Sequence, residues 1–215
     1  MFEGHYNHWR NSRIEGIKKY VNLDVLKGKT MLEVGCGYAD LGNIFSQFGC
    51  KVTSSDARVE HLNEVNKRYP HINTFLLDCD KDKVVDKYDI ILHWGVLYHI
   101  TNIKEHLQNV CEKCDILFLE SEVSDIIDPE YNIDVKENGY DQAFNNLGSR
   151  PSEKYVEQIL EDNGFNFKII KDPILNSDFH FYDWDIKETK NYKNGLRRYW
   201  ICWKPTVDML SFKFN

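Results

Sequence analysis

The chain has 215 residues, of which 42% are hydrophobic and 28% charged, a composition typical of one folded globular domain. Its formal net charge of −7 at pH 7 argues against a nucleic-acid-binding protein, because such proteins hold phosphates with lysine and arginine. No apolar run approaches the ~20 residues of a membrane-spanning helix, and the first residues lack the pattern of a signal peptide. We therefore predict a cytoplasmic protein whose six cysteines are reduced, with no membrane and no nucleic-acid partner.

The first segment of the chain is expected to form a helix over about residues 5–20. Trp9, Ile14, Ile17 and Tyr20 recur there near helical spacing. This helix would precede the first strand of the domain.

An apolar strand over about residues 30–35 ends in two glycines, Gly35 and Gly37. Glycine lets the backbone turn sharply there and lets a ligand approach with no Cβ in the way. A dinucleotide-binding loop needs a third glycine three positions after the second; that position holds Asp40, which we expect to cap the next helix. Glu33 in the strand would repel phosphates but attract a positively charged ligand. The loop therefore favours S-adenosylmethionine, which carries a sulfonium and an ammonium group, over NAD.

The next two expected strands each end in an acid. The strand over about 51–55 leads to Asp56, 21 residues after the first glycine of the loop. An acid at about this distance accepts hydrogen bonds from ribose hydroxyls in nucleotide-binding α/β folds, although it could also cap the next helix. The strand over about 72–77 leads to Asp78, and Asp80 is the alternative two residues later.

The run Glu33-Val-Gly35-Cys-Gly37-Tyr-Ala39 resembles the first motif of class I S-adenosylmethionine-dependent methyltransferases, with Ala39 replacing the usual third small residue. The resemblance covers roughly residues 28–204. It implies a Rossmann-like three-layer α/β sandwich with a mostly parallel seven-stranded sheet, order 3-2-1-4-5-7-6, whose last strand is antiparallel. It also implies that Asp56 holds the ribose and that Asp78 holds the adenine amino group. The cofactor-binding residues it implies are Glu33, Gly35, Cys36, Gly37, Asp56, Ala57, Asp78, Cys79, His93, Trp94 and Arg13.

The remaining patterns alternate between strand and helix, as a parallel sheet covered by helices on both faces requires. Ser152 is placed to cap the last helix, and Gly164 to end it. One domain over residues 1–215 accounts for the whole pattern. Further strands are expected near 88–93, 115–120, 165–170 and 196–204, and further helices near 40–48, 58–68, 102–113 and 152–163.

The fourth strand leads into a segment that holds two histidines, His93 and His99. By the resemblance, this segment lies between the methionine part of the cofactor and the methyl acceptor. The unperturbed pKa of histidine lies nearest physiological pH, so either ring could take the proton of an acceptor hydroxyl. We predict His99 as the catalytic base because it lies further into the loop, with His93 as the second candidate.

The lead-in segment over residues 1–27 is expected to act as a lid. In the family that the chain resembles, a helix ahead of the first strand often closes over the cofactor. Tyr6, Trp9 and Arg10 suit this role, and Arg13 could pair with the carboxylate of the cofactor.

Two long connections, residues 121–151 and 173–195, should leave the cofactor face of the sheet and recognise the substrate. The first holds seven acids against one lysine and one arginine, and the second is rich in aromatic residues. Carboxylates and aromatic rings suit a sugar ring, a polyhydroxylated molecule or an amine. No metal-ligand spacing is recognisable, so no metal site is predicted. The predicted substrate residues are Tyr98, Arg150, Tyr182 and Trp184.

These features predict an S-adenosylmethionine-dependent methyltransferase that acts on a small-molecule acceptor, by O-methylation of a sugar-like or polyhydroxylated substrate. N-methylation of a small amine, a non-catalytic S-adenosylmethionine-binding protein and an NAD(P)-dependent reductase are the alternatives. The segment after the fourth strand lacks the Asn/Asp-Pro-Pro-aromatic and Pro-Cys signatures of nucleic-acid base methyltransferases. A homodimer stays open as the assembly.

Overall fold

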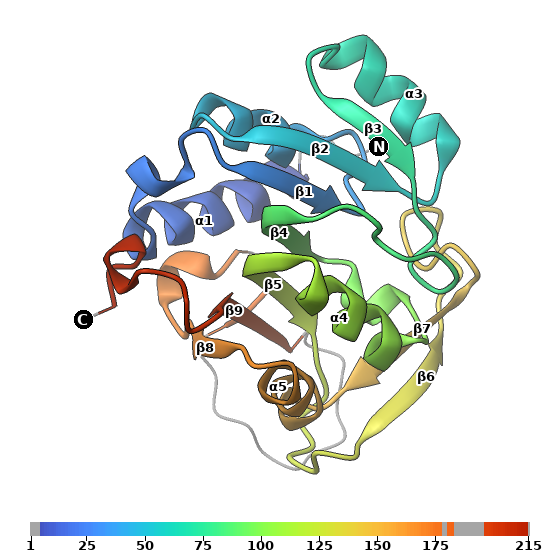
Figure 1. The fold of residues 1–215 in the computed structure, drawn as a ribbon. Helices are drawn as coiled ribbons and strands as arrows, with labels where there is room; N and C mark the ends of the chain where they lie inside the picture. Colours follow the sequence, from blue (N-terminus) through green and yellow to red (C-terminus); the bar gives the residue numbers. More distant parts are fainter. Residues whose placement is uncertain (1–4, 178–179, 183–195, 215) are drawn as a thin grey trace.

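A seven-stranded sheet forms the centre of the protein in the computed structural model, which describes residues 5–177, 180–182 and 196–214 (Figure 1). The neighbouring strands β1, β2, β3, β4 and β5 all pair in parallel. Strand β9 is antiparallel to both of its neighbours. The predicted strand order and the antiparallel last strand are therefore confirmed. Across the sheet the strands are β3 (Asn73–Leu76), β2 (Lys51–Asp56), β1 (Thr30–Val34), β4 (Tyr88–Trp94), β5 (Cys114–Glu122), β9 (Arg197–Trp203) and β8 (Asn166–Ile169).

Helices cover both faces of the sheet and divide the core into two layers. One layer packs α1, α2 and α3 against strand residues such as Met31 and Ile90, and the other packs α4 and α5 against Leu32 and Ile91. Because neighbouring residues of a strand point to opposite faces, a strand covered on both sides is apolar at nearly every position. The helices are α1 (His5–Tyr20), α2 (Asp40–Gln47), α3 (Val59–Arg68), α4 (Ile103–Glu112) and α5 (Glu153–Asp162).

The ends of two helices test the expected capping residues. Ser152 caps α5, since its side chain accepts a hydrogen bond from the Tyr155 backbone N–H, as predicted. The prediction for α2 is wrong by one residue: Ala39, in the left-handed region at φ 57°, precedes the helix, and Asp40 is its first residue. The Asp40 carboxylate instead contacts Arg10 at 3.1 Å and accepts a hydrogen bond from the Tyr69 hydroxyl at 2.9 Å.

A two-stranded hairpin that the sequence analysis did not predict lies within the connection from β5 to α5. Its strands are β6 (Asn132–Lys136) and β7 (Leu147–Pro151), which pair antiparallel. The hairpin packs on the short 3₁₀ helix η2 (Leu97–His99) that follows β4: the Ser149 hydroxyl donates to the Ile100 carbonyl at 2.6 Å. Gly148 is required there, because a Cβ on it would lie 2.3 Å from the Tyr98 carbonyl oxygen.

The longest described helix, α1, has 16 residues. Over the described parts of the chain, every helix is too short or too polar to span a lipid bilayer.

Candidate functional site

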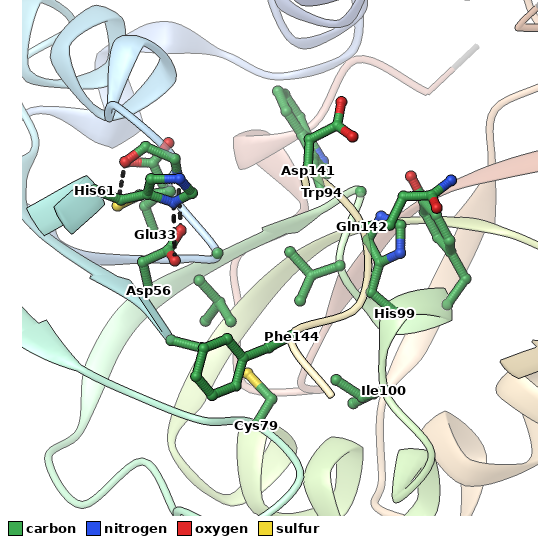
Figure 2. Close-up of a pocket in the computed structure, with 18 of the residues that line it drawn as sticks. Glu33, Asp56, His61, Cys79, Trp94, His99, Ile100, Asp141, Gln142 and Phe144 are labelled. Atoms are coloured by element: carbon green, nitrogen blue, oxygen red, sulfur yellow. Dashed lines mark hydrogen bonds and ion pairs between the residues drawn. The ribbon is translucent and has the colours of Figure 1, made fainter. Parts of the chain in front are cut away.

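A cavity of about 390 Å³ opens at the carboxyl ends of β1, β2 and β4, where open α/β sheets bind their ligands (Figure 2). Residues of α1 and of the β6–β7 hairpin complete its wall. Most of the predicted site residues line this cavity. These are Glu33, Gly35, Cys36, Gly37, Asp56, Ala57, Asp78, Cys79, Trp94, Tyr98, His99 and Arg150.

The glycine-rich loop adopts the backbone conformation for which glycine is suited. Gly35 and Gly37 have φ values of 62° and 53°, in the left-handed region that other residues rarely adopt. A Cβ on Gly35 would also lie 2.3 Å from a methyl carbon of Val96. The backbone conformation of the turn therefore requires glycine at both positions.

The Glu33 carboxylate is held by hydrogen bonds to the elements next to the glycine-rich loop. Its carboxylate accepts hydrogen bonds from the Ser54 hydroxyl at 2.7 Å and from the Gly42 backbone N–H at 3.2 Å. Burial raises the pKa of Glu33 to about 7, although these two hydrogen bonds oppose the shift. The close packing of α2 on β1 explains Gly42, where a Cβ would lie 2.4 Å from the carboxylate.

Asp56 lies at the end of β2 with its carboxylate anchored beside the glycine-rich loop. It accepts hydrogen bonds from the backbone N–H groups of Gly37 and Arg58, both at 2.9 Å, and lies 3.1 Å from the His61 ring. A carboxylate has about four lone-pair positions, so hydroxyl donors can still bind it from the cavity side. The helix after Asp56 begins at Val59, and its N-cap residue is Arg58, so Asp56 is not that cap.

The two acids after β3 do different things. Asp80 accepts hydrogen bonds from the backbone N–H groups of Thr101 and Asn102, at 2.8 and 2.9 Å, and so satisfies donors at the start of α4. Asp78 pairs with the exposed Lys81 at 2.8 Å. Asp78 also accepts a hydrogen bond from the Asp80 backbone N–H at 3.1 Å, and both acids line the cavity.

His93 does not line the cavity, so the prediction that it binds the cofactor or acts as a base is wrong. Its ring is fully buried, with Nε2 at 2.9 Å from Nε2 of His106. Burial and the neighbouring His106 lower the pKa of His93 to about 3. A neutral ring enclosed in the core has no route to a substrate.

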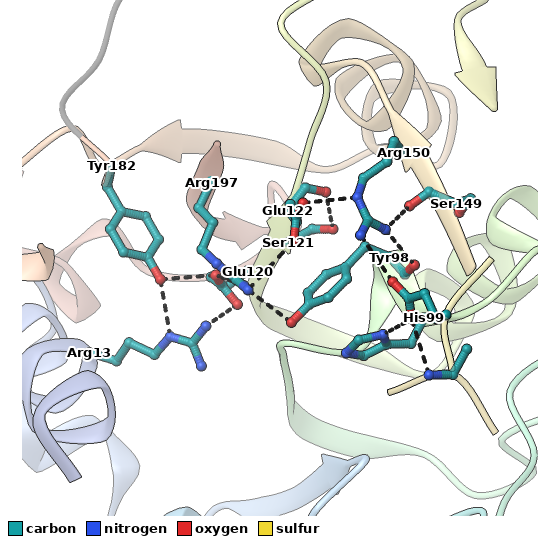
Figure 3. A network of polar contacts seen from close by, with 12 residues as sticks. Arg13, Tyr98, His99, Glu120, Ser121, Glu122, Ser149, Arg150, Tyr182 and Arg197 are labelled. Carbon is teal, nitrogen blue, oxygen red and sulfur yellow. Dashed lines mark hydrogen bonds and ion pairs between the residues drawn. The ribbon is translucent and has the colours of Figure 1, made fainter. Parts of the chain in front are cut away.

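Arg13 and Tyr182 are also placed outside the cavity wall, in a buried cluster around Glu120 (Figure 3). Glu120 pairs with Arg13, pairs with Arg197 at 2.8 Å, and accepts a hydrogen bond from the Tyr182 hydroxyl at 2.9 Å. Burial alone would raise the pKa of Glu120, but the two guanidinium charges lower it to about 2. Arg13 is committed to this cluster, so the predicted pairing with the cofactor carboxylate and the predicted substrate contact of Tyr182 are corrected.

Trp184 lies outside the described residues, as does Phe179 of the same aromatic run. Of that connection, the described His180 lines the cavity.

The side chain of His99 borders the cavity and contacts the hairpin (Figure 3). Its Nδ1 contacts a carboxylate oxygen of Glu137, the residue that follows β6. Arg150 donates to the other Glu137 oxygen at 3.0 Å and to Glu122 at 2.9 Å. His99 and Arg150 are predicted from the sequence, whereas Glu137 is not, because no sequence pattern distinguishes it from the other six acids of the long connection.

The N-terminal part of α1 contacts the hairpin across the mouth of the cavity. The Tyr6 hydroxyl donates to the Asp141 carboxylate at 2.6 Å, and Tyr6, Trp9 and Arg10 all line the cavity. From the other side, Arg58 donates to the Gln142 carbonyl at 2.9 Å. Gln142 and Phe144 also line the cavity, and no local sequence pattern predicts this for either residue.

The described residues offer no group of three His, Cys, Asp or Glu side chains that could hold a metal ion.

Comparisons with known proteins identify the family and the fold of this chain. A family profile described as a methyltransferase domain matches residues 6–168. The N-terminal domain of EvdMO1, crystallised with S-adenosylhomocysteine and D-fucose, has a TM-score of 0.66 at 13% identity, over 94% of this chain and 84% of that one. Magnesium protoporphyrin IX methyltransferase from Synechocystis PCC 6803, with bound S-adenosylmethionine, has a TM-score of 0.61 at 15% identity, over 92% and 79%. A search of curated proteins finds no match.

The structural neighbours share the fold at low identity, and the family profile spans most of the chain. The resemblance that the sequence analysis drew from the glycine-rich motif is thereby confirmed. The chain belongs to the methyltransferase domain family.

Proposed function

We propose that this protein is an S-adenosylmethionine-dependent methyltransferase that methylates a hydroxyl of a small, neutral or cationic acceptor. The observation that carries the proposal is the placement of His99 in the wall of one cavity with the glycine-rich loop and Asp56. A histidine that can take a proton thus faces the same cavity as the residues suited to hold the cofactor.

The chemistry of the cavity fits this cofactor. Among the described residues that line the cavity, carboxylates outnumber arginines and no lysine is present, so a pyrophosphate would find little positive charge. Asp56 would accept the ribose hydroxyls and Asp78 the adenine amino group. Leu77, Cys79 and Ile100 all line the cavity and offer an apolar slot for the adenine ring. Figure 2 shows Cys79 near Phe144, which lies in the loop between β6 and β7.

The carboxylate of the cofactor is assigned to Arg10 in place of Arg13. Both lie on α1, but Arg10 lines the cavity and Arg13 is buried against Glu120. The guanidinium of Arg10 is held beside Asp40, at the start of the helix that follows the glycine-rich loop.

Asp56→Ala should weaken S-adenosylmethionine binding by about thirtyfold, or about 2 kcal/mol, as expected for losing hydrogen bonds to a charged group. Calorimetric titration measures this, and Asp86→Ala, which removes an exposed acid, is the control. Since Asp56 also anchors Gly37, thermal unfolding of the variant should be recorded as well. An unchanged dissociation constant would rule out the ribose-binding role.

The acceptor end of the cavity disfavours anions. Its two arginines are already paired, Arg150 with Glu122 and Glu137, and Arg197 with Glu120. Asp141 adds a further carboxylate to this wall. The D-fucose in the EvdMO1 crystals supports a sugar-like acceptor, and hydroxyl-rich molecules suit a wall of carboxylates and aromatic rings.

When bound, S-adenosylmethionine would supply a methyl group on a positively charged sulfur: the acceptor oxygen bonds to the methyl carbon, and the sulfur leaves as the neutral thioether of S-adenosylhomocysteine. The protein must then align the acceptor and take up its proton. Nδ1 of His99 is occupied by Glu137, so Nε2 is the ring nitrogen that receives the hydroxyl proton. The hairpin and α1 would limit the access of water to this step.

We also propose that α1 acts as a lid through its contact with the hairpin. Tyr6→Phe removes the hydrogen bond to Asp141 and should speed cofactor dissociation about three- to tenfold, the usual value of one hydrogen bond. Stopped-flow fluorescence measures the rate, with Tyr155→Phe on α5 as control. Deleting the start of α1 would be a poorer test, because Arg13 and Ile14 belong to the core. An unchanged dissociation rate would contradict the lid.

The proposal is tested by incubating the protein with tritiated S-adenosylmethionine and pools of sugars, amines and carboxylic acids. Label in the sugar pool supports the proposal, and label in the amine pool would replace it with N-methylation. Tight cofactor binding without transfer to any pool would favour a non-catalytic binding protein.

A further inference from the structure

The base assigned to His99 is assembled from two parts of the chain that lie far apart in sequence. His99 follows β4, whereas the carboxylate that contacts its Nδ1 belongs to Glu137, which lies 38 residues later. Both oxygens of Glu137 are engaged: one also accepts the Ala143 backbone N–H at 3.1 Å, and the other accepts from Arg150 at 3.0 Å. Glu137 is therefore fixed in place before it meets the histidine.

The charge state of Glu137 decides what it does to the histidine ring. Burial opposes ionisation of the carboxyl, but its hydrogen bond and charge interaction with His99 and the charge of Arg150 outweigh this and lower the pKa of Glu137. An ionised carboxylate only accepts hydrogen bonds, so Nδ1 of His99 must carry the proton of that contact. In the neutral ring, Nε2 then holds the lone pair.

The same hairpin segment is tied to the walls of the cofactor half of the cavity. Four residues after Glu137, Asp141 binds Tyr6 of α1, and the next residue, Gln142, binds Arg58 through its carbonyl. Arg150 on β7 also donates to the Tyr98 carbonyl at 3.3 Å, next to His99. A hairpin that moved away from the cavity would therefore take the carboxylate from His99.

We infer that Glu137 is a positioning residue, which holds His99 in the Nδ1–H form with Nε2 free to accept a proton when the hairpin is docked over the cavity. This inference rests on the proposed function, because it assigns a partner to the proposed base. The hairpin then covers the site and also supplies the Glu137 carboxylate, which holds His99 in the tautomer that can accept a proton.

The test is a double-mutant cycle of Glu137→Gln and His99→Ala. Glu137→Gln alone should lower kcat by between about 10-fold and 10⁴-fold, as expected when a histidine base loses the carboxylate that orients it, with an unchanged KM for the cofactor. In the His99→Ala background the same substitution should have almost no further effect on kcat. Asp134→Asn removes another acid from the same hairpin, at an exposed position, and should leave kcat unchanged.

A second measurement needs no turnover and no substitution at Glu137. Proton–nitrogen correlation spectra of the wild-type protein report the tautomer of each histidine ring, and the signals of His99 are those absent from His99→Ala. We expect the Nδ1–H form at His99. The Nε2–H form would overturn the inference even if Glu137→Gln failed to fold.

The single and double variants distinguish failure of this inference from failure of the proposed function on which it rests. Full activity of His99→Ala would show that His99 is not the base, and the proposed chemistry would then be wrong. The role of Glu137 alone would be ruled out by either of two results. One is that His99→Ala loses kcat as expected while Glu137→Gln stays fully active; the other is that the losses of kcat add in the double variant.

Discussion

His99→Ala should lower turnover by about 10²–10⁴-fold, the typical contribution of a positioned general base. Its affinity for S-adenosylmethionine should stay close to that of the wild type, because the residues proposed to hold the cofactor are elsewhere in the cavity. Comparing kcat with the calorimetric dissociation constant separates the two quantities.

A matched control is His71→Ala, which removes an exposed histidine outside the cavity and should leave turnover unchanged. Near-normal turnover in His99→Ala would show that the proton is taken elsewhere or that the acceptor is an amine. His93 would not be the replacement, because its ring is enclosed in the core against His106.

Glu120→Ala should cost about 3–5 kcal/mol in free energy of unfolding, since it leaves two buried arginines without their counter-charge. Arg13 and Arg197 both pair with this carboxylate, and the side chains of Arg13 and Glu120 are fully buried. Urea unfolding measures the loss, and Glu112→Ala, at an exposed position, should stay within about 0.5 kcal/mol of the wild type. A loss below about 1 kcal/mol would mean that the cluster is not sealed from water.

The same cluster should make the protein sensitive to acid. The pKa of Glu120 is about 2 in the folded chain, against an ordinary value of 4.5. Because the folded-state pKa is the lower one, the stabilisation is complete above about pH 4.5 and disappears as the pH falls towards 2. The unfolding free energy of Glu120→Gln should therefore depend less on pH over this range than that of the wild type.

Local sequence was enough to predict the fold and the floor of the cavity. A short strand–turn–helix pattern identifies Gly35 and Gly37, and the spacing along the chain identifies Asp56. Both signals are local and do not depend on the rest of the structure. The apolar runs of β4 and β5 likewise identify strands that are buried on both faces.

Long-range pairing explains what the sequence did not reveal. Arg13 reads as an ordinary surface arginine of a helix, and only the fold brings it to Glu120, 107 residues later. His93 and His99 are both candidate bases in sequence, but the ring of His93 is buried in the core and that of His99 borders the cavity. Glu137 lies in an acid-rich run that is typical of a solvated surface, and its role depends on a hairpin packed against η2. Side-chain pairing across such distances leaves no periodicity in the sequence.

Calorimetric titration of the wild-type protein with S-adenosylmethionine, and in parallel with NADH, tests the central claim most directly. The cavity described here predicts saturable binding of one S-adenosylmethionine per chain, weakened by Asp56→Ala, and no binding of NADH. Saturable binding of NADH with no heat from S-adenosylmethionine would contradict the account and would favour a nicotinamide-dependent reductase.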